Sequence, residues 1–503
     1  MSHEEMLTKG AMTTLFALFR AGAVRAALIL PALVLCLTAE GGFDSVTAGR
    51  VAGTEGMISY EARVETIALK DEKDRPLAEF VAFSYTASGS DVAAERPVVF
   101  LFNGGPIVPS VYLHMGLFGP SRVKLEGSPG SGSSQGWSLE SNPDTLLDAA
   151  DLVYIDPPTT GFSRLADGRR PEDFLGIKED ARLVADFILK WLERHDRRKS
   201  PVYLFGESYG TIRAPHVGQM ITRADPPARL GGMMLLGQAV NIVEYSQRPD
   251  NILSYVVSLP SLALIARHHG LSEFSGLKPD ELYRKAAEFA EREYLPALYR
   301  GGQIAQDRLE RMAKKLAAFT GIPASWYVEH RLRISKQEFS RRLIQDPPAL
   351  LGQYDGRYSG PLDDDNPVDP AASIAEAYQQ AFETYRNDVL GVDAGANYVL
   401  RAGISHLDDW DWLGSSPFGH FNYARVIDEL FEDIAEFRLY IGSGYYDLTT
   451  TSGSADHLVR QSSWPADRVM LKHYPSGHMA YSDEESARRI ARDVRAFMAG
   501  QQR

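Results

Sequence analysis

The chain has 503 residues, with 53 Lys and Arg against 66 Asp and Glu, a formal net charge of −13 and one cysteine. Because a single compact core rarely grows beyond about 250–300 residues, this length predicts one large domain with insertions or two domains. A hydrophobic content of 44% excludes wholesale disorder and fibrous architecture. The acidic balance argues against nucleic-acid binding, and one cysteine excludes an intrachain disulfide.

The first forty residues have the pattern of a targeting segment. Arg20 and Arg25 precede an apolar run over residues 26–37, and small residues follow it. This pattern is typical of a secretory signal peptide, and the run is too short for a spanning helix. We therefore predict a signal peptide over residues 1–41 and a periplasmic or secreted protein without a stable membrane span after its removal. An uncleaved anchor or a buried helix is the alternative.

The next part of the chain alternates between strand-like and helix-like patterns. Residues 58–69 and 78–88 predict antiparallel strands that are joined by a charged turn at residues 70–75. Apolar runs typical of buried parallel strands follow at residues 97–105, 150–156, 202–205 and 231–239. Helical periodicity separates them at residues 179–194 and 211–223. This alternation predicts an α/β fold with a mainly parallel sheet.

The pattern changes after residue 242, where long amphipathic helices are predicted up to residue 431. Two of these helices are expected over residues 279–299 and 304–319. Strand-like runs return at residues 437–442 and 468–473, before a final helix over residues 485–498. We therefore predict a core in two parts, residues 42–242 and 432–503, with a helical cap insertion over residues 243–431.

The segment Gly206-Glu207-Ser208-Tyr209-Gly210 matches the pattern G-x-S-x-G. It follows a predicted strand and precedes a predicted helix, which is the setting in which a serine sits on a strained turn with its hydroxyl exposed. Ser208 is therefore the candidate nucleophile. A tight strand–helix turn without chemistry is the alternative.

A nucleophilic serine needs a base, and the base needs an acid that orients it. In sites built on this strand–turn–helix motif, the acid and then the histidine follow the serine along the chain. This order selects Asp447 and His478, because both lie just after predicted strands. His473 is a rival base but falls on the strand itself, whereas His216 falls on the helix after Ser208, where packing is expected.

The oxyanion hole of such a site needs two backbone N–H groups. Tyr209, directly after the nucleophile, is one candidate donor. The second is Gly105, in the loop after the strand at residues 97–105, because paired glycines allow a close approach of the backbone. A plain β-turn is the alternative for this loop.

Taken together, these motifs resemble the serine carboxypeptidases (peptidase family S10). The matching segments occur in the same order: FNGGP at residues 102–106, YIDPPTTGFS at 154–163, GESYG at 206–210, YD at 446–447 and GHM at 477–479. The resemblance implies an α/β-hydrolase fold with a helical cap insertion, and hydrolysis of the C-terminal residue of peptides.

The resemblance also implies how the substrate is held. Asn103 and Glu207 match the family residues that bind the C-terminal carboxylate of the peptide. A hydrogen bond between two carboxyl groups needs one shared proton, so the pKa of Glu207 must be raised. The alternative for Glu207 is a salt bridge, for example to Arg213.

Two positions depart from the family pattern. Ile107 stands where a glycine is usual, and a β-branched residue makes a positive φ costly, so the loop is expected to be reshaped. Leu117 stands where a glutamate usually supports carboxylate recognition, so a supporting group is expected to be absent. The single cysteine excludes the disulfides of many eukaryotic members, which points to a bacterial-type member.

The sequence thus predicts a serine-type carboxypeptidase with the triad Ser208, Asp447 and His478. The alternatives are an esterase, amidase or acyltransferase on the same scaffold, a prolyl aminopeptidase, or an inactive peptide-binding homologue, because the cap rather than the triad sets the substrate. No metal or other cofactor is expected. The expected partner is a peptide with a free C-terminal carboxylate, and the oligomeric state is left open.

Overall fold

The computed structural model describes residues 35–36, 43–89, 93–127, 136–362, 368–393, 395–401, 409–413 and 421–501. Apart from the two-residue strand β1, the predicted signal peptide over residues 1–41 lies outside these ranges. Within them, no helix is both long enough and apolar enough to cross a membrane.

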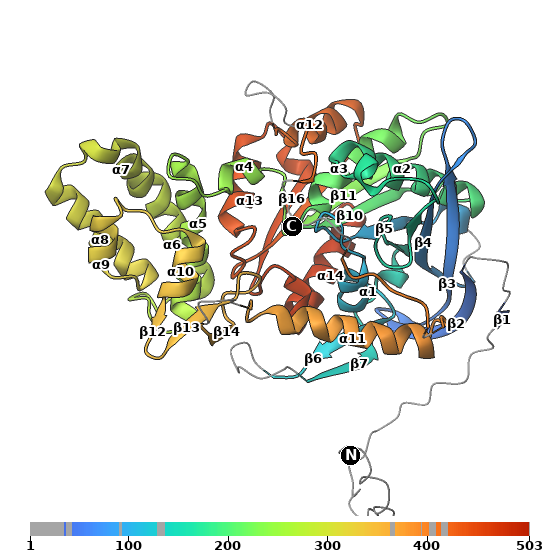
Figure 1. Cartoon of the computed structure of the whole chain (residues 1–503), viewed down its shortest axis with the longest axis horizontal. Helices are drawn as coiled ribbons and strands as arrows, with labels where there is room; N and C mark the ends of the chain where they lie inside the picture. The colour runs from blue at the N-terminus through green and yellow to red at the C-terminus, as the bar shows by residue number, and fades with distance from the viewer. Residues whose placement is uncertain are drawn as a thin grey trace, which may run out of the picture.

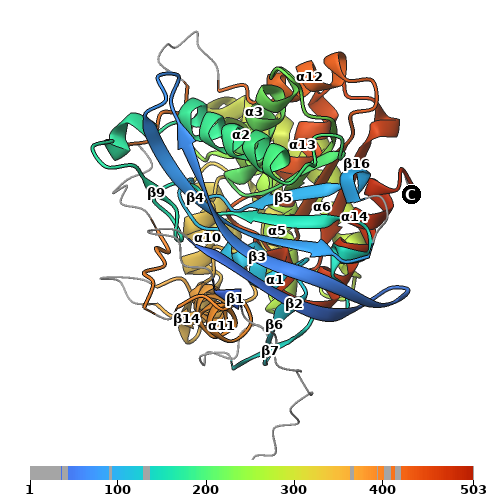
Figure 2. The same ribbon diagram turned by 90° about the vertical axis from the view of Figure 1, so that its right-hand side faces the viewer.

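An 11-stranded sheet runs through the centre of the molecule (Figure 2). Its strand order is β1-β2-β3-β4-β8-β5-β10-β11-β15-β16, and the short strand β9 pairs with β4. The strands, in chain order, are β1 (Leu35–Cys36), β2 (Asp44–Gly53), β3 (Gly56–Lys70), β4 (Pro76–Ala87), β5 (Val98–Phe102), β8 (Asp151–Ile155), β9 (Arg164–Leu165), β10 (Val202–Glu207), β11 (Leu230–Leu236), β15 (Leu439–Gly444) and β16 (Val469–Tyr474).

The six strands from β8 to β16 are parallel to one another, whereas β1 to β4 form an antiparallel extension. Every residue of β5, β8, β10 and β15 is buried, as expected for strands with helices on both faces. The predicted α/β fold with its antiparallel N-terminal pair is therefore confirmed. Because the strands are parallel, their carboxyl ends meet at one edge, and loops from several strands converge there.

Helices cover both faces of the sheet (Figure 2). One hydrophobic core lies under α2 (Ile177–Arg194), α3 (Gly210–Thr222), α12 (Ala424–Asp433) and α13 (Ser452–Gln461). The other lies under α1 (Val111–Gly116), α11 (Ala372–Asp388) and α14 (Glu484–Met498), next to the two-stranded sheet of β6 (Ser121–Leu125) and β7 (Trp137–Ser141). The sheet is thus enclosed on both faces, and only its strand ends remain for a site.

A separate group of helices, here called the cap, extends to one side of the sheet (Figure 1). It consists of α5 (Ile252–His268), α6 (Pro279–Phe289), α7 (Leu295–Arg300), α8 (Gln306–Thr320), α9 (Ala324–Glu329) and α10 (Lys336–Arg342), followed by β12 (Ile344–Gln345), β13 (Pro348–Leu351) and β14 (Ser359–Pro361). The cap has its own hydrophobic core, to which Tyr445, Tyr446 and Leu448 of the loop after β15 also belong. That loop therefore joins the cap to the sheet.

The region between residues 243 and 431 is more varied than the predicted run of helices. The helix expected over residues 279–299 is divided into α6 and α7 by a π-helical turn at Ala290–Tyr294. The short sheet β12-β13-β14 was not predicted. Helices α11 and α12 pack on the faces of the central sheet instead of on the cap helices. The domain boundaries themselves stay a prediction.

Candidate active site

Ser208 occupies the turn between β10 and α3. Its φ is +57°, a left-handed conformation that a serine rarely adopts, and its backbone N–H donates to Leu236 O at 3.0 Å. The turn is tight: a Cβ on Gly206 would lie 2.1 Å from Gly210 O. A strained serine between a strand and a helix is the arrangement that presents a nucleophile at the edge of a sheet. Ser208 itself is half-buried, so its side chain is accessible.

Asp447 and His478 lie together at the same edge, after β15 and β16. His478 Nδ1 lies 2.8 Å from Asp447 Oδ2, and both side chains are buried. Thr450 Oγ1 donates to the same oxygen at 2.6 Å, while the N–H groups of Thr449 and Thr450 donate to Oδ1 at 2.6 and 2.9 Å. The carboxylate is therefore held by four donors, and it can orient the imidazole as a triad acid does.

Ser208 and His478 flank one turn at the end of β11. The Ser208 N–H binds the carbonyl of Leu236, and a Cβ on the next residue, Gly237, would lie 3.2 Å from two atoms of the His478 ring. Gly237 also has a φ of +58°. Because Gly237 has no side chain, the imidazole can approach the end of β11, whose Leu236 carbonyl binds the N–H of Ser208. The structure therefore brings the three predicted triad residues to one place.

The charges of the pair are coupled. Burial alone would raise the pKa of the Asp447 carboxyl, but the imidazolium of His478 and the Thr450 donors lower it overall. Burial alone would lower the pKa of His478, but the carboxylate of Asp447 raises it overall. The pair thus makes the imidazole more basic than a free one, which suits a general base.

The loop at residues 103–106 lies directly against the nucleophile turn. A Cβ on Gly104 would lie 2.5 Å from Tyr209 N, so only glycine allows this contact. Gly105 takes a φ of +108° and is exposed. Tyr209 precedes the first residue of α3, where a backbone N–H has no partner inside the helix. The two predicted oxyanion donors, Gly105 and Tyr209, therefore belong to segments in contact.

Ile107 does not take a positive φ, and the expected reshaping of this loop relative to the family stays a prediction. Ile107 is buried in the core beneath α2 and α3, and it does not occur among the described non-glycine residues with a positive φ. Gly105 adopts the left-handed conformation instead, so the β-branched side chain carries no such strain. The positive φ of this loop lies at Gly105, two residues before Ile107.

Arg213 holds the same loop from α3. It is fully buried and donates to Asn103 O at 2.7 Å and to Pro106 O at 2.8 Å. Its other N–H groups bind both carboxylate oxygens of Asp180, at 2.7 and 3.0 Å. The salt bridge considered between Arg213 and Glu207 is therefore not formed, because the guanidinium is occupied by Asp180 and the loop carbonyls.

Glu207, directly before the nucleophile, is buried together with two polar side chains. Asn103 Nδ2 donates to Glu207 Oε2, and Tyr481 OH donates to Oε2 at 2.9 Å and lies 3.2 Å from Oε1. Burial raises the pKa of Glu207 to about 7, although His478 and Tyr481 oppose the shift. The raised pKa expected from the sequence is thus present. A neutral carboxyl here can donate a proton to a carboxylate ligand.

Tyr481 was missed in the sequence because nothing local marks it. It lies 274 positions from Glu207 in the chain, in the turn between β16 and α14. Leu117, where the family pattern has a glutamate, is buried in the same hydrophobic core as Tyr481. The hydroxyl of Tyr481 supplies a supporting hydrogen bond to Glu207 from a different element. The weak signal was its position three residues after His478.

A cap segment also supports the triad and was not predicted. Tyr354 O accepts from the backbone N–H of His478 at 2.6 Å, and Gln353 O accepts from that of Leu448 at 3.0 Å. The Tyr354 ring lies 5.3 Å from the imidazole, edge to face, and is 45% exposed. The segment therefore joins the loops that carry Asp447 and His478, and it lines the approach to them.

The rival histidines have other roles. His473 lies on β16, as expected, and its Nε2 is 2.9 Å from Asp456 Oδ1. His216 lies on α3 and its Nδ1 is 2.9 Å from Ile212 O within that helix. Among the described residues, no group of three or more His, Cys, Asp or Glu side chains has the arrangement of a metal site.

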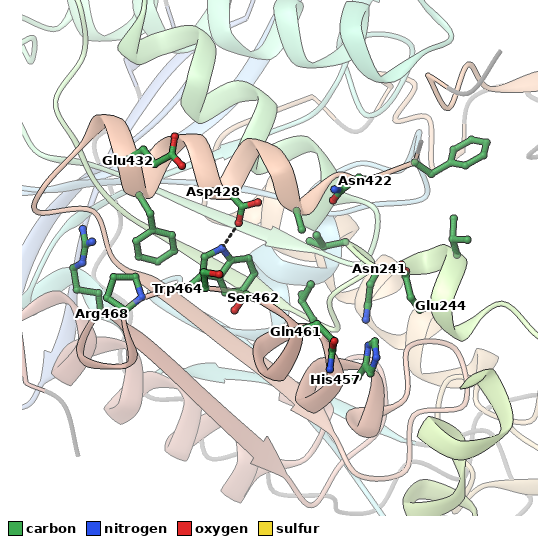
Figure 3. Close-up of a pocket in the computed structure, with 18 residues that line it drawn as sticks. Asn241, Glu244, Asn422, Asp428, Glu432, His457, Gln461, Ser462, Trp464 and Arg468 are labelled. Atoms are coloured by element: carbon green, nitrogen blue, oxygen red, sulfur yellow. Dashed lines mark hydrogen bonds between the residues drawn. The ribbon is translucent and has the colours of Figure 1, made fainter. Parts of the chain in front are cut away.

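A cavity of about 810 Å³ lies away from these residues, between α12, α13 and α4 (Ile242–Tyr245) (Figure 3). Its wall includes Trp464, whose Nε1 donates to Asp428 Oδ1 at 2.7 Å, with Glu244 and His457 farther along. None of the predicted site residues lines it. The cavity is therefore separate from the candidate active site.

The fold defines the class of protein. The chain matches the crystal structure of a prohormone-processing carboxypeptidase from Saccharomyces cerevisiae over 91% of both chains, with a TM-score of 0.53 and 16% sequence identity. At that identity the match shows the fold alone. The protein therefore has an α/β-hydrolase fold, as predicted.

The sequence comparisons show which family the chain resembles. The serine carboxypeptidase family model matches residues 78–251. Serine carboxypeptidase-like 14 of Arabidopsis thaliana is 29% identical over 202 residues, covering 39% of this chain and 43% of the relative. Serine carboxypeptidase-like 37 of the same plant is 33% identical over 153 residues, 29% of each chain. These matches show that the chain is similar to serine carboxypeptidases over part of its length.

The extent of these matches is limited. Pheromone-processing carboxypeptidase KEX1 of Saccharomyces cerevisiae is 26% identical over 171 residues, 32% of this chain and 22% of the relative. The chain thus spans less than half the length of the curated relatives that it matches. These relatives come from a plant and a yeast, so they do not support a bacterial-type member.

Proposed function

We propose that the protein is a serine-type carboxypeptidase, which removes the C-terminal residue of peptides through an acyl-enzyme. One observation carries this proposal: the buried group of Asn103, Glu207 and Tyr481 lies directly beside the nucleophile turn. A carboxyl that stays neutral to about pH 7, at the residue before the serine, suits the capture of a substrate carboxylate.

The reaction follows from the positions of the side chains. Ser208 Oγ attacks the last peptide carbonyl while His478 takes its proton, and Asp447 stabilises the imidazolium that forms. The N–H groups of Gly105 and Tyr209 bind the oxyanion. The tetrahedral intermediate then collapses, the C–N bond breaks, and His478 gives its proton to the leaving amine. Water, activated by the same imidazole, hydrolyses the acyl-enzyme and restores the serine.

Glu207 contributes recognition and not bond breaking. In its neutral form it donates its proton to the substrate carboxylate, with Asn103 and Tyr481 holding its oxygens in place. The amino acid released from the peptide therefore leaves from the side of the site that Glu207 occupies. Once Glu207 ionises, it repels a carboxylate, so substrate binding weakens as the pH rises through about 7.

Three other parts of the proposal rest on the sequence. The signal peptide predicts a periplasmic or secreted enzyme, and the lone cysteine favours a bacterial-type member. The partner is a peptide with a free C-terminal carboxylate, without a cofactor. An esterase, amidase or acyltransferase is the second candidate function, which the exposed Tyr354 ring beside His478 favours because an apolar edge accepts uncharged acyl groups.

One assay separates these functions. The protein is incubated at pH 6 with an N-blocked dipeptide, with its C-terminal amide and with an aryl ester, and the products are identified by mass spectrometry. A carboxypeptidase releases free amino acid from the dipeptide at a much higher rate than it cleaves the amide. Equal turnover of acid and amide would contradict the role of Glu207, and turnover of the ester alone would favour the second function.

Replacing the nucleophile tests the assignment of Ser208. Because Ser208→Ala removes the attacking oxygen, we expect kcat to fall by about 10⁴-fold or more while the thermal unfolding midpoint stays close to that of the wild type. Ser463→Ala, at an exposed serine, is the matched control and should retain full activity. A Ser208→Ala protein that still turns over the dipeptide refutes the assignment.

A further inference from the structure

Lys336, the first residue of cap helix α10, reaches the loop that carries Asp447. Its Nζ donates to Thr449 O at 3.1 Å and lies 5.3 Å from the centre of the Tyr245 ring. The N–H of Thr449 in turn donates to Asp447. A cationic side chain of the cap is therefore linked to the triad acid through a single residue, Thr449.

The ammonium group forms no direct hydrogen bond to an acidic side chain of the described chain. Within the part of the chain that the structure describes, Lys336 forms no ion pair, and its polar contact is a single carbonyl. The nearest acid in sequence, Glu338, is engaged in capping α10 through Ser335. An ammonium has three N–H donors, so two of them remain available. Burial lowers the pKa of Lys336 to about 8, although the nearby carboxylate of Asp447 opposes this shift.

A second unsatisfied donor lies beside the same residue. The side-chain oxygen of Gln247 accepts from the backbone N–H of Lys336 at 2.6 Å, which leaves its Nε2 buried without a partner in the described chain. Buried donors are almost always paired in folded proteins. Two donors without acceptors, next to the loop that carries Asp447, suit a ligand that brings an acceptor.

The strand order indicates which part of a substrate lies nearest Lys336. The order is β5-β10-β11-β15, with Ser208 at the end of β10. Asn103 follows β5, on one side of the serine. The contacts of Lys336 are on the other side, because Tyr245 follows β11 and Thr449 follows β15. If the C-terminal carboxylate binds at Asn103, the residue on the acyl side of the scissile bond extends towards Lys336.

We propose that Lys336 selects peptides in which the residue on the acyl side of the scissile bond carries a side-chain carboxylate, Asp or Glu. This inference rests on the proposed carboxypeptidase function, which supplies the direction of the peptide. The carboxylate of the substrate completes the hydrogen bonds of the ammonium and adds a negative charge in direct contact with it. A charge-assisted hydrogen bond in a buried site favours the acidic peptide by about 10- to 100-fold over its amide isostere.

The test compares two N-blocked dipeptides that differ only in this residue, Glu or Gln, each followed by leucine. At pH 6 the glutamate side chain is ionised and Glu207 is mainly protonated. The kcat/KM ratio of the Glu peptide to the Gln peptide is measured for the wild type, Lys336→Met, Lys336→Arg and Lys336→Glu. Thermal unfolding and circular dichroism of each variant report whether it is folded.

The expected wild-type ratio is about 10 to 100. It should fall to about 1 in Lys336→Met through loss of the Glu peptide alone, stay above 1 in Lys336→Arg, and fall below 1 in Lys336→Glu. A wild-type ratio near 1 overturns the inference. So does an equal loss for both peptides in Lys336→Met, which would make Lys336 a positioning residue for the Asp447 loop.

The same two peptides also test the proposed carboxypeptidase function, independently of the role of Lys336. If the wild type releases amino acid from neither peptide, the carboxypeptidase proposal fails, and the inference is decided by affinity. Titration calorimetry then measures binding of the same two peptides. Tighter binding of the Glu peptide that is lost in Lys336→Met supports selection by Lys336, and equal affinities overturn it.

Discussion

Replacing Glu207 by glutamine removes the titration that is proposed to control substrate binding while keeping the geometry. Glu207 Oε2 accepts from both Asn103 and Tyr481. The amide oxygen of glutamine can take that position, which directs its NH₂ group towards the bound carboxylate. Because the amide is neutral and donates at every pH, Glu207→Gln should bind peptides with an affinity that does not depend on this residue's ionisation.

The magnitude follows from the pKa. With a pKa of about 7, Glu207 is about 90% protonated at pH 6 and about 10% at pH 8. The KM of the wild type for an N-blocked dipeptide should therefore rise about tenfold between these values, whereas that of Glu207→Gln should stay flat. KM is the better measure, because kcat also contains the titration of His478.

Stability gives an independent measurement. Burial raises the pKa of Glu207 from 4.5 to about 7, so above pH 4.5 the unfolded chain releases a proton that the folded chain keeps. The free energy of unfolding therefore falls as the pH rises from 4.5 to 7, by about 3 kcal/mol in all. Glu207→Gln lacks this loss, so it should gain up to about 3 kcal/mol relative to the wild type at pH 8 and little at pH 4.

Urea unfolding at pH 4 and pH 8, together with KM at pH 6 and pH 8, tests this reasoning. Glu436→Gln, at an exposed position, is the matched control and should follow the wild type in both measurements. The reasoning is refuted if the KM of Glu207→Gln rises with pH as steeply as that of the wild type. It is also refuted if the variant gains no stability at pH 8.

Two other substitutions probe the support of the site. Asp447→Asn should lower kcat by about 10³- to 10⁴-fold, because the amide no longer stabilises the imidazolium of His478; a loss below tenfold in a pre-steady-state assay would argue against this role. Arg213→Met should lower the free energy of unfolding by about 3–5 kcal/mol, because it leaves Asp180 buried without its cation. Urea unfolding measures this, and restored stability in the double variant with Asp180→Asn would confirm the cause.

The fold was predictable where the pattern of side chains is local. Continuous apolar runs gave the buried strands β5, β8, β10 and β11 within a few residues, because parallel strands covered on both faces exclude polar residues. Helices α11 and α12 were harder. An amphipathic pattern shows that one face is buried but not what covers it, so both were grouped with the cap helices although they pack on the sheet.

The site was predictable where a motif fixes the backbone. The glycines around Ser208 mark a tight turn, and Asp447 and His478 follow strands at one sheet edge. The parts that were missed depend on contacts between distant segments. Tyr481 meets Glu207 across 274 positions, and Arg213 binds loop carbonyls about 110 positions away. Hydrogen bonds of this kind leave no periodic signal in a single sequence.

A phosphonate analogue of an N-blocked dipeptide, with a phosphonate ester in place of the scissile carbonyl, tests the central claim most directly. We predict that the analogue with a free C-terminal carboxylate modifies Ser208, identified by peptide mass spectrometry, at least tenfold faster at pH 6 than its C-terminal amide. Modification of another residue, or equal rates for the two analogues, would contradict the claim that Ser208 attacks a peptide held by its C-terminal carboxylate.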